Sequence, residues 1–543
     1  MKNRIYYVKN AYITLFILVI ISYLNYRIAF SLFDLIDSAE SGLWDEFYKH
    51  ARELIIFTVI VLPVNITYAY LKGLVIKKSM TKMKTDYMKK VFGKNISEFQ
   101  AQNNALYISA ITNDFNTIEK NYVEQVLEIL ESIIRFATAI IIISLISPLI
   151  ILIGLVMVLV NVIISVLSSK PVNKHNKERS EMMSSFGGFI KEVLSAFHII
   201  KTNNLEATVT ATYNKESKRV QEKKFVIDRI MSFIFAVQNS TTQFLFFGLL
   251  IVVSYLMING VLLFAGLIVV ITQIGDIIDP VTRIAQSIPK ILSVKSLFIR
   301  INETLENRND KEETMSYDGF NKSIEFKDVG FSYDEKVVLK SINVNFEKGK
   351  KYLVIGPSGG GKSTLLRLLR KYFDPLEGEI LIDGNNLSEI KKIDYFSKIA
   401  NVEQQTFLFE DTFINNLTLY KEYSDEEIWD AINRAGLHDF ISSHVDGLNR
   451  MILDNGKNIS GGERSRIAIA RALLNKVEIL FLDEAFASLD RKLTVEIEKS
   501  MLALKNITII NVSHVIIDEN KSMYDEVVLI NHNSATIMTP QTN

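Results

Sequence analysis

The chain has 543 residues, a formal net charge of zero and no cysteine. Its mean hydropathy of +0.18 is high for a soluble protein, and its length allows two or three domains. The balanced charge argues against nucleic acid as a partner, and the lack of cysteine excludes disulfides and thiol chemistry.

Apolar residues are concentrated in the first 300 positions, in four blocks long enough to cross a bilayer, which needs about 20 apolar residues. The last two blocks are long enough for two spans each, with turns at Ser147-Pro148 and at Met257–Gly260. The sequence therefore predicts an all-α transmembrane domain of six helices. The four blocks are Ala11–Phe33, Leu54–Ile76, Ile133–Leu167 and Thr242–Ile278.

Basic residues predict the orientation of these spans. Lys77–Lys120 and Lys170–Arg229 are rich in Lys and Arg and are expected in the cytoplasm, together with the N-terminus. The acidic segment Asp34–Glu53 is expected to form an outer loop. Because 172–279 contains no proline, the spans should continue into the cytosol as helical stalks. Their turning points, near Asn95–Asn104 and Thr202–Ala207, are candidates for short crosswise coupling helices.

The domain boundaries follow from a change in composition. Residues 1–306 form the predicted transmembrane domain, and 307–320 form a polar linker. From 321 to 543, short apolar runs alternate with helical stretches, as in an α/β nucleotide-binding domain. This domain is expected to be cytoplasmic.

A phosphate-binding loop follows the apolar run Leu353–Ile355 and fits G-x-x-x-x-G-K-[ST] at every fixed position. Its glycines let successive backbone N–H groups point into one concavity, and the helix that begins near Lys362 adds its positive end. Lys362 would reach the β- and γ-phosphates of ATP, and Ser363 would ligate Mg²⁺. The loop comprises Gly356, Pro357, Ser358, Gly359, Gly360, Gly361, Lys362, Ser363 and Thr364.

Two carboxylates, Asp483 and Glu484, end the apolar run Ile479–Leu482. Asp483 is expected to hold Mg²⁺, directly or through water. Glu484 is expected to orient and polarise the water that attacks the γ-phosphate.

Between the loop and the carboxylates lies Ser460-Gly461-Gly462-Glu463. Together these motifs resemble the ATP-binding cassette (ABC) family, and the six-span plan with two intracellular loops resembles its exporter branch. The resemblance implies that each ATP is held between the phosphate loop of one subunit and the Ser460 segment of another. A second copy of the chain is then the expected partner, with a heterodimer as the alternative.

The same resemblance assigns further residues. Tyr333 matches the aromatic residue that stacks on adenine, and Gln404 matches the glutamine that ligates Mg²⁺ and senses the transport domain. His514 matches the histidine that contacts the γ-phosphate, and Asp490 matches the loop that faces the partner subunit. The chain departs from the family pattern at Ile459 and Glu463, which replace Leu and Gln, and at Ile452–Gly456, which lacks the usual exporter motif. Ala110–Asp114 resembles a first-loop motif of exporters.

The function implied by this resemblance is ATP-driven export across the cytoplasmic membrane of a bacterium, by a dimer of half-transporters that hydrolyses ATP to ADP and phosphate. A small peptide or peptide-derived natural product is the favoured cargo, and multidrug or lipid export is the alternative. An ATP-gated channel or regulatory subunit is an alternative of another class. Such relatives usually have two fused halves, regulatory inserts or a lost catalytic glutamate, and this sequence has none of these features.

Polar residues in the last two spans indicate a cargo cavity, because polar groups inside a membrane usually face the protein interior or water. Asp276, Asp279 and Arg283 follow Thr272 at helical spacing. The predicted cavity would suit a cationic or amine-bearing cargo, with Arg283 partly neutralising the aspartates. Alternatively, the stripe only joins neighbouring helices. Arg27 is assigned to the outer end of the first span, where it would snorkel or pair with Asp34. The candidate cavity residues are Gln238, Asn239, Thr242, Gln243, Thr272, Asp276 and Asp279.

Overall fold

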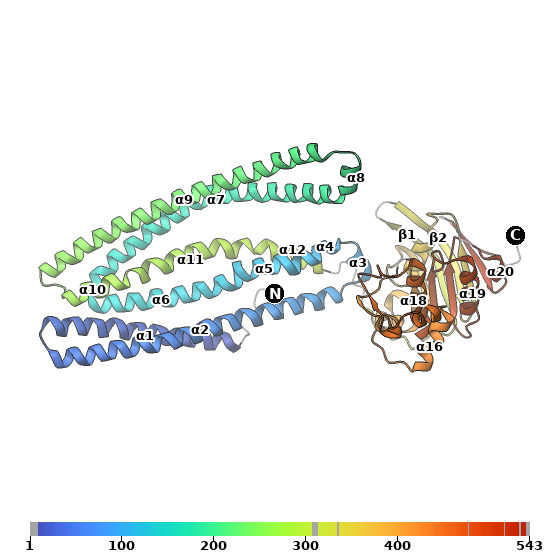
Figure 1. Ribbon diagram of the computed structural model, residues 1–543, viewed down its shortest axis with the longest axis horizontal. Helices are drawn as coiled ribbons and strands as arrows, with labels where there is room; N and C mark the ends of the chain where they lie inside the picture. Colours follow the sequence, from blue (N-terminus) through green and yellow to red (C-terminus); the bar gives the residue numbers. More distant parts are fainter. Residues whose placement is uncertain are drawn as a thin grey trace. The chain divides into compact units, whose positions relative to one another are not determined.

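The computed structural model describes residues 9–306, 313–333, 336–404, 406–475, 477–514, 516–531 and 534–538. The predicted cytoplasmic N-terminus before Lys9 and the linker residues 307–312 lie outside these ranges. The chain forms two compact units (Figure 1). The first contains Met1–Gly93 and Gln102–Glu306, and the second contains Lys94–Ala101 and Asn307–Asn543.

The secondary structure in the described residues of the first unit is entirely helical, with short turns between the helices. Within them, five helical stretches are long and apolar enough to cross a membrane, and the apolar start of α7, Pro148–Ile164, is a shorter sixth. The long helices are α1 (Lys9–Glu40), α2 (Trp44–Phe92), α6 (Glu124–Ile146), α7 (Pro148–Ser195), α9 (Glu206–Ile258) and the consecutive α10 (Phe264–Gln273) and α11 (Gly275–Ser293). The shorter elements are α4 (Asn104–Ser109), η2 (Ala110–Asp114), α5 (Phe115–Ile118), η3 (Glu119–Val123), α8 (Phe197–Thr202) and α12 (Lys295–Leu305).

Two turns between spans lie at residues that end one helix or begin the next. Ser147 is extended, with φ −159°, and Pro148 begins α7, where its missing N–H costs nothing. Gly260, with φ +72°, follows α9 and supplies a left-handed conformation that glycine adopts readily. The predicted six-helix transmembrane architecture is confirmed.

The connection between the first two spans differs from expectation. Asp34–Glu53 is not a loop, because α1 continues to Glu40 and α2 begins at Trp44. The expected pairing of Arg27 with Asp34 is also wrong. Arg27 instead lies 3.7 Å from Glu53 of α2 and stacks over the Phe57 ring. These contacts join the facing sides of α1 and α2, so Arg27 has partners within the helical hairpin.

Helix pairing within the first unit determines which residues meet. In Figure 1, α1 runs beside α2, α6 beside α11, and α7 beside α9. Leu18 and Ile21 of α1 pack with Tyr68 of α2 and, from α6, with partly buried Ile134. A second apolar core joins α6, α7, α9, α10 and α11, and it includes Ile143. Helices α1, α2, α6, α10 and α11 therefore surround a common interior.

Two short helices lie near the predicted turning points of the stalks. Helix α3 (Ile96–Gln100) clusters with the second unit, where the Lys392 ammonium donates a hydrogen bond to Asn95 Oδ1 at 2.7 Å. Helix α8 ends at Thr202, where the second predicted turning point begins.

The described residues of the second unit form three sheets. A six-stranded sheet has the order β12-β11-β3-β10-β9-β6, and its strands are parallel except β12. The other sheets are antiparallel, with the orders β2-β1-β4-β5 and β7-β8. The strands are β1 (Ser323–Tyr333), β2 (Lys336–Glu347), β3 (Lys351–Ile355), β4 (Glu377–Ile382), β5 (Asn385–Asn386), β6 (Ile399–Val402), β7 (Asp411–Thr412), β8 (Met451–Ile452), β9 (Ile479–Asp483), β10 (Thr508–Val512), β11 (Glu526–Asn531) and β12 (Ser534–Met538).

Helices pack around these sheets and complete an α/β domain, as expected. The central strands read as continuous apolar runs because both faces of a parallel sheet are covered. The helices are α13 (Lys362–Leu369), α14 (Lys392–Lys398), α15 (Phe413–Thr418), α16 (Asp425–Arg434), α17 (His438–Ser442), α18 (Gly461–Leu474), α19 (Arg491–Leu502) and α20 (Asp518–Lys521), with single turns η4 (Leu387–Glu389) and η5 (Gly447–Asn449).

Residues 313–320, predicted as linker, pack into this α/β domain. Met315 forms a parallel bridge with Ile390. Phe320 is fully buried, and its N–H donates to Glu478 Oε2 at 2.6 Å. The apolar side chains of this segment belong to the domain core. The linker was predicted from the polar residues that precede them.

Candidate functional site

Four adjacent parallel strands carry the predicted nucleotide-binding residues at their carboxyl ends. β3 leads into Gly356, β10 into His514, β9 into Glu484 and β6 into Gln404. The register aligns the ends, since Val512 of β10 pairs with both Val354 of β3 and Asp483 of β9. The carboxyl edge of an open parallel sheet is the usual place for a ligand in such folds.

The phosphate loop requires glycine at two positions. A Cβ on Gly356, at φ +153°, would lie 2.1 Å from the carbonyl oxygen of Ile530. A Cβ on Gly361, at φ +100°, would lie 2.4 Å from Leu339 Cδ2. Gly361 also precedes the first turn of α13, so its freedom to adopt this φ aims the helix N-terminus at the loop.

Lys362 lies folded into the loop. Its ammonium donates to the carbonyl oxygens of Gly356 at 2.9 Å and Pro357 at 3.0 Å, and the residue is 4% exposed. Burial lowers the pKa of Lys362, while the carboxylates of Glu484 and Asp483 act in the opposite direction. A phosphate in the loop would restore favourable surroundings for the charged ammonium.

Asp483 is a largely buried carboxyl at the end of β9. Burial raises its pKa, and the Arg370 guanidinium, 3.7 Å away, opposes that shift. Ser363 is exposed beside the loop. The described residues contain no cluster of three or more His, Cys, Asp or Glu side chains that could hold a metal alone. One carboxylate and one hydroxyl suit Mg²⁺, which commonly completes its coordination with water and substrate phosphates.

Glu484 is held by two of the residues predicted to act with it. Gln404 Nε2 donates to Glu484 Oε2 at 2.7 Å, and His514 Nε2 lies 2.9 Å from Glu484 Oε1. The three side chains follow the carboxyl ends of β6, β9 and β10, so the fold brings the predicted catalytic group to the same sheet edge as Lys362.

Ser460 begins α18 as its N-cap. Its hydroxyl accepts the N–H of Glu463 at 3.2 Å, and Glu463 Oε2 accepts the N–H of Ser460 at 2.7 Å. This capping box explains why glutamate serves at a position where the family usually has glutamine. Ser460 and Gly461 are exposed at the positive end of this helix. Asp490 caps α19 in the same way, accepting the N–H of Leu493 at 3.0 Å.

Tyr333 ends β1 beside two other aromatic residues. Its ring lies edge-on to Phe331 and Phe373, with centroids 5.0 and 5.6 Å away. Its hydroxyl accepts a hydrogen bond from Arg367 of α13 at 3.0 Å. Adenine stacking by Tyr333 stays a prediction.

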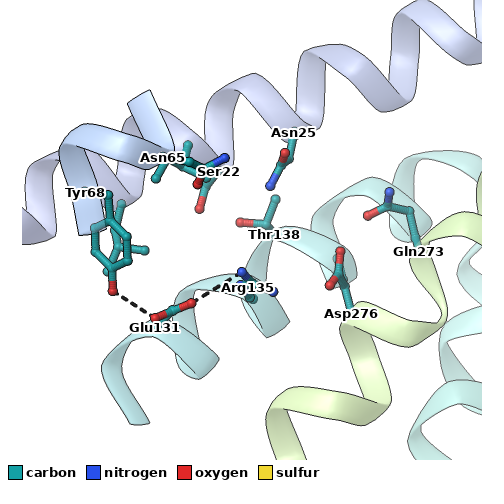
Figure 2. A pocket seen from close by; sticks show the side chains of 12 residues that line it. Ser22, Asn25, Asn65, Tyr68, Glu131, Arg135, Thr138, Gln273 and Asp276 are labelled. Atoms are coloured by element: carbon teal, nitrogen blue, oxygen red, sulfur yellow. Dashed lines mark hydrogen bonds and ion pairs between the residues drawn. The ribbon is translucent and has the colours of Figure 1, made fainter. Parts of the chain in front are cut away.

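The helical unit contains a polar pocket of about 60 Å³ between α1, α2, α6, α10 and α11 (Figure 2). Glu131 lies on one wall and accepts hydrogen bonds from the Tyr68 hydroxyl at 2.8 Å and the Lys72 ammonium at 3.1 Å. Arg135 lies 3.3 Å from the same carboxylate. Across the pocket, Asp276 makes no hydrogen bond or ion pair with any residue that the structure describes.

Comparison with known proteins identifies the chain. A family model described as ABC transporter transmembrane region matches residues 6–281. A second model, described as ABC transporter, matches residues 339–487. The chain belongs to the ABC transporter family. Its two matched regions are the helical unit and the α/β unit described above.

Similar proteins include bacterial members of the family. A multidrug resistance ABC transporter ATP-binding and permease protein of Lactococcus lactis is 30% identical over 65% of this chain and 61% of its own length. An ATP-dependent lipid A-core flippase of Syntrophus aciditrophicus is 30% identical over 61% of this chain and 56% of its own length. The matches thus span about three fifths of these relatives.

A solved structure of a bacterial Atm1-family ABC exporter with ATP bound matches with a TM-score of 0.84. The match covers 98% of this chain and 95% of that one at 19% identity. The ABC transporter described here therefore has the exporter fold.

The transporter brings only part of the predicted cargo cavity together. Asp276 lines the pocket. Thr272 and Asp279 are exposed, and the four candidates on α9 lie on a helix that packs with α7. Those four residues stay predictions for cargo contact: Gln238, Asn239, Thr242 and Gln243. Arg283 makes its ion pair with Glu128 of α6, at 2.6 Å. Its charge also acts on Asp279, so the expected neutralisation of the aspartates is found only in part.

Two groups of site residues were not predicted from the sequence. Glu131 and Arg135 lie one helical turn apart at the edge of an apolar block, and this spacing was the available signal. In the nucleotide unit, Glu403 accepts the Tyr372 hydroxyl at 3.1 Å and lies 3.7 Å from Arg370. Its position beside Gln404 could have indicated a site residue.

Proposed function

We propose that the transporter is an ATP-driven exporter that hydrolyses ATP to ADP and phosphate. The observation that carries this proposal is the gathering of Lys362, Glu484 and His514 at one edge of the parallel sheet, in a chain that also carries the helical unit. Lys362 would neutralise phosphate charge, and Glu484 would orient the attacking water. Gln404 and His514 would hold the Glu484 carboxylate in place until nucleotide enters.

Mg²⁺ is the proposed cofactor, with Ser363, Asp483 and Gln404 as the residues that would hold it. When bound, Mg²⁺ neutralises charge on the β- and γ-phosphate oxygens. The support for such a site is its position and donor set: Asp483 ends β9 at the same sheet edge as the phosphate loop, and Ser363 lies in the first turn of α13. A carboxylate and a hydroxyl beside bound phosphates are ligands that Mg²⁺ accepts.

The proposed working form is a dimer of two copies in the cytoplasmic membrane of a bacterium, with the N-terminus and nucleotide unit in the cytoplasm. Ser460 and Gly461 support the dimer, because they expose the N-terminus of α18, a helix of 14 residues. A helix N-terminus with exposed N–H groups suits the γ-phosphate of an ATP held by another copy. A heterodimer with a related chain is the alternative.

The proposed cargo is an amphipathic compound, either a drug-like molecule or a lipid. The names of the relatives reported above support these two classes, and neither name mentions a peptide. The initial preference for peptide cargo therefore gives way to the multidrug-or-lipid alternative. A pocket of about 60 Å³ that is lined by both polar and apolar residues has room for only one group of such a ligand.

Glu484→Gln tests the proposed reaction. Full-length protein in lipid nanodiscs should retain ATP affinity within about threefold, because Lys362, Ser363 and Asp483 are intact. Its ATP turnover should fall at least a hundredfold, since about 3 kcal/mol of transition-state stabilisation is lost. Near-normal turnover would show that another group positions the water.

A further inference from the structure

The ionisable groups of the polar pocket are unequally partnered. Its lining includes two carboxylates, Glu131 and Asp276, and one guanidinium, Arg135. Glu131 is fully engaged, since Tyr68, Lys72 and Arg135 all contact its two oxygens. Asp276 is half-buried and makes no hydrogen bond or ion pair among the residues with described positions. The charge of Arg135, which pairs with Glu131, acts on Asp276 only from beyond ion-pair distance.

Asp276 faces groups that would solvate a small ligand (Figure 2). The same pocket is lined by the amides of Asn25 and Gln273 and by the hydroxyl of Thr138. These side chains come from α1, α10 and α6, so the site is built from several helices. A carboxylate without a hydrogen bond or ion pair is costly within a membrane-spanning bundle, and a cationic group in direct contact would relieve that cost.

A second pocket of about 50 Å³ adjoins the first, and it is lined almost entirely by apolar side chains. Leu18 and Tyr68 line both pockets. The second pocket is lined by Leu15 on α1 and Leu130 on α6, and the polar pocket is lined by residues further along these two helices. From Leu15 to Ser22 the helix rises about 10 Å. A polar end and an apolar end thus lie next to each other in one groove.

The volumes limit what each pocket accommodates. About 60 Å³ is small beside the roughly 300–1,000 Å³ of pockets that enclose drug-sized ligands. This space suits a single ammonium group rather than a whole drug molecule. The neighbouring apolar pocket suits part of an alkyl chain.

We propose that these two pockets receive the charged end and the adjoining chain of a cargo that carries one protonated amine on an apolar body. Asp276 binds the ammonium, the amides and Thr138 solvate it, and the chain lies past Leu18 and Tyr68. Alkylamines, like lysine, are protonated at neutral pH. This inference names the cargo class and rests on the proposed export function.

Direct binding of radiolabelled n-decylamine tests the site independently of ATP hydrolysis. Full-length protein in nanodiscs is compared with empty nanodiscs. Saturable binding is expected, with competition by unlabelled decylamine but not by decanol or decanoate. Asp276→Asn should weaken binding at least about tenfold, because it removes the charge from a charge-assisted hydrogen bond. Unchanged binding to Asp276→Asn would overturn the proposal. Competition by decanoate that equals the competition by decylamine would also overturn it, and would favour Arg135 as an anion site.

Two further variants control for misfolding. Asp228→Asn removes an exposed carboxylate on α9, whose residues line neither pocket, and should change decylamine affinity less than twofold. Asp276→Glu keeps the charge and should recover most of the binding. Failure of Asp276→Glu to bind better than Asp276→Asn would contradict a charge-based role. ATP turnover in the same wild-type sample separates the two proposals: bound amine without turnover rejects ATP-driven export but leaves the amine site standing.

Discussion

Glu484 adopts φ +51°, a conformation that a non-glycine residue rarely adopts. Its N–H donates to the carbonyl oxygen of Val512 at 2.9 Å, which ties this unusual backbone to the neighbouring strand. Strained backbone of this kind is concentrated at functional sites. The carboxylate is thereby directed to Gln404 and His514 rather than along β9.

Gly361→Ala should abolish ATP binding at micromolar nucleotide. The new Cβ would overlap Leu339 and would also force alanine into a left-handed φ, so the loop must shift. Gly349→Ala is the matched control, since Gly349 has φ +80° but no atom within 4 Å of the added Cβ. Calorimetric titration with ATP should find at least a tenfold weaker affinity for Gly361→Ala and no change for Gly349→Ala. Equal affinities would show that the contact with Leu339 is unimportant.

Fixed motif spacing in the sequence predicts most residues of the nucleotide site. The sequence does not predict the residues of the polar pocket around Asp276. Fixed spacing identifies the phosphate loop because each residue in it has a separate backbone or phosphate contact. By contrast, the pocket around Asp276 depends on Asn25, Thr138 and Gln273, which are distant in sequence and individually unremarkable. Helix periodicity placed Asp276 and Asp279 on one stripe, but pairing of α6 with α11 exposes the second aspartate.

At the scale of elements, the segment before β1 is anchored by a charged cluster. Glu313 accepts hydrogen bonds from the Lys392 N–H, at 2.8 Å, and pairs with the ammonium groups of Lys392 and Lys371, at 2.8 and 3.1 Å. Burial alone would raise the pKa of Glu313, but these partners hold it below its ordinary value. Burial also lowers the pKa of Lys371, so this lysine depends on the carboxylate to remain charged.

Glu313→Gln should lower the unfolding free energy of the nucleotide unit by about 2 kcal/mol at pH 7, because Lys371 loses its partner. A carboxyl with a depressed folded-state pKa stabilises the fold above its unfolded pKa, about 4.3. The difference between wild type and variant should therefore shrink as pH falls below that value. Thermal unfolding from pH 7 down to about pH 3, which extends below the unfolded pKa, measures it, with the exposed Glu389→Gln as control. A difference that stays constant with pH would contradict the role of the charge.

Secondary-structure boundaries show where sequence patterns were sufficient. Apolar blocks and the Ser147-Pro148 turn predicted the spans, because chain reversal in a membrane needs a residue that ends a helix. The acidic segment Asp34–Glu53 was misassigned, since charged residues are compatible with helix ends as well as loops. Residues 313–320 were misassigned as linker because the buried Phe320 lies within a polar stretch.

At the scale of the whole molecule, the proposed dimer predicts complementation between two inactive subunits. Ser460→Arg should block the trans contact, and Lys362→Ala should disable the loop, so each homodimer has two defective sites. Co-reconstituted variants should regain ATP turnover, since a mixed dimer rebuilds one intact site. Differently tagged subunits that co-purify prove that mixed dimers form. Purified mixed dimers without any recovered turnover would argue against sites shared between subunits.

The central claim is that ATP hydrolysis moves cargo against its gradient. Its most direct test is uptake of a radiolabelled amphipathic quaternary amine into sealed vesicles whose nucleotide-binding units face outward. A quaternary amine keeps its charge at every pH and cannot accumulate by following a proton gradient. With ATP and Mg²⁺ outside, wild-type vesicles should accumulate the compound above its external concentration, and Glu484→Gln vesicles should not. ATP-dependent entry that stops at equal concentrations on both sides, or accumulation that is the same in Glu484→Gln, would contradict the account.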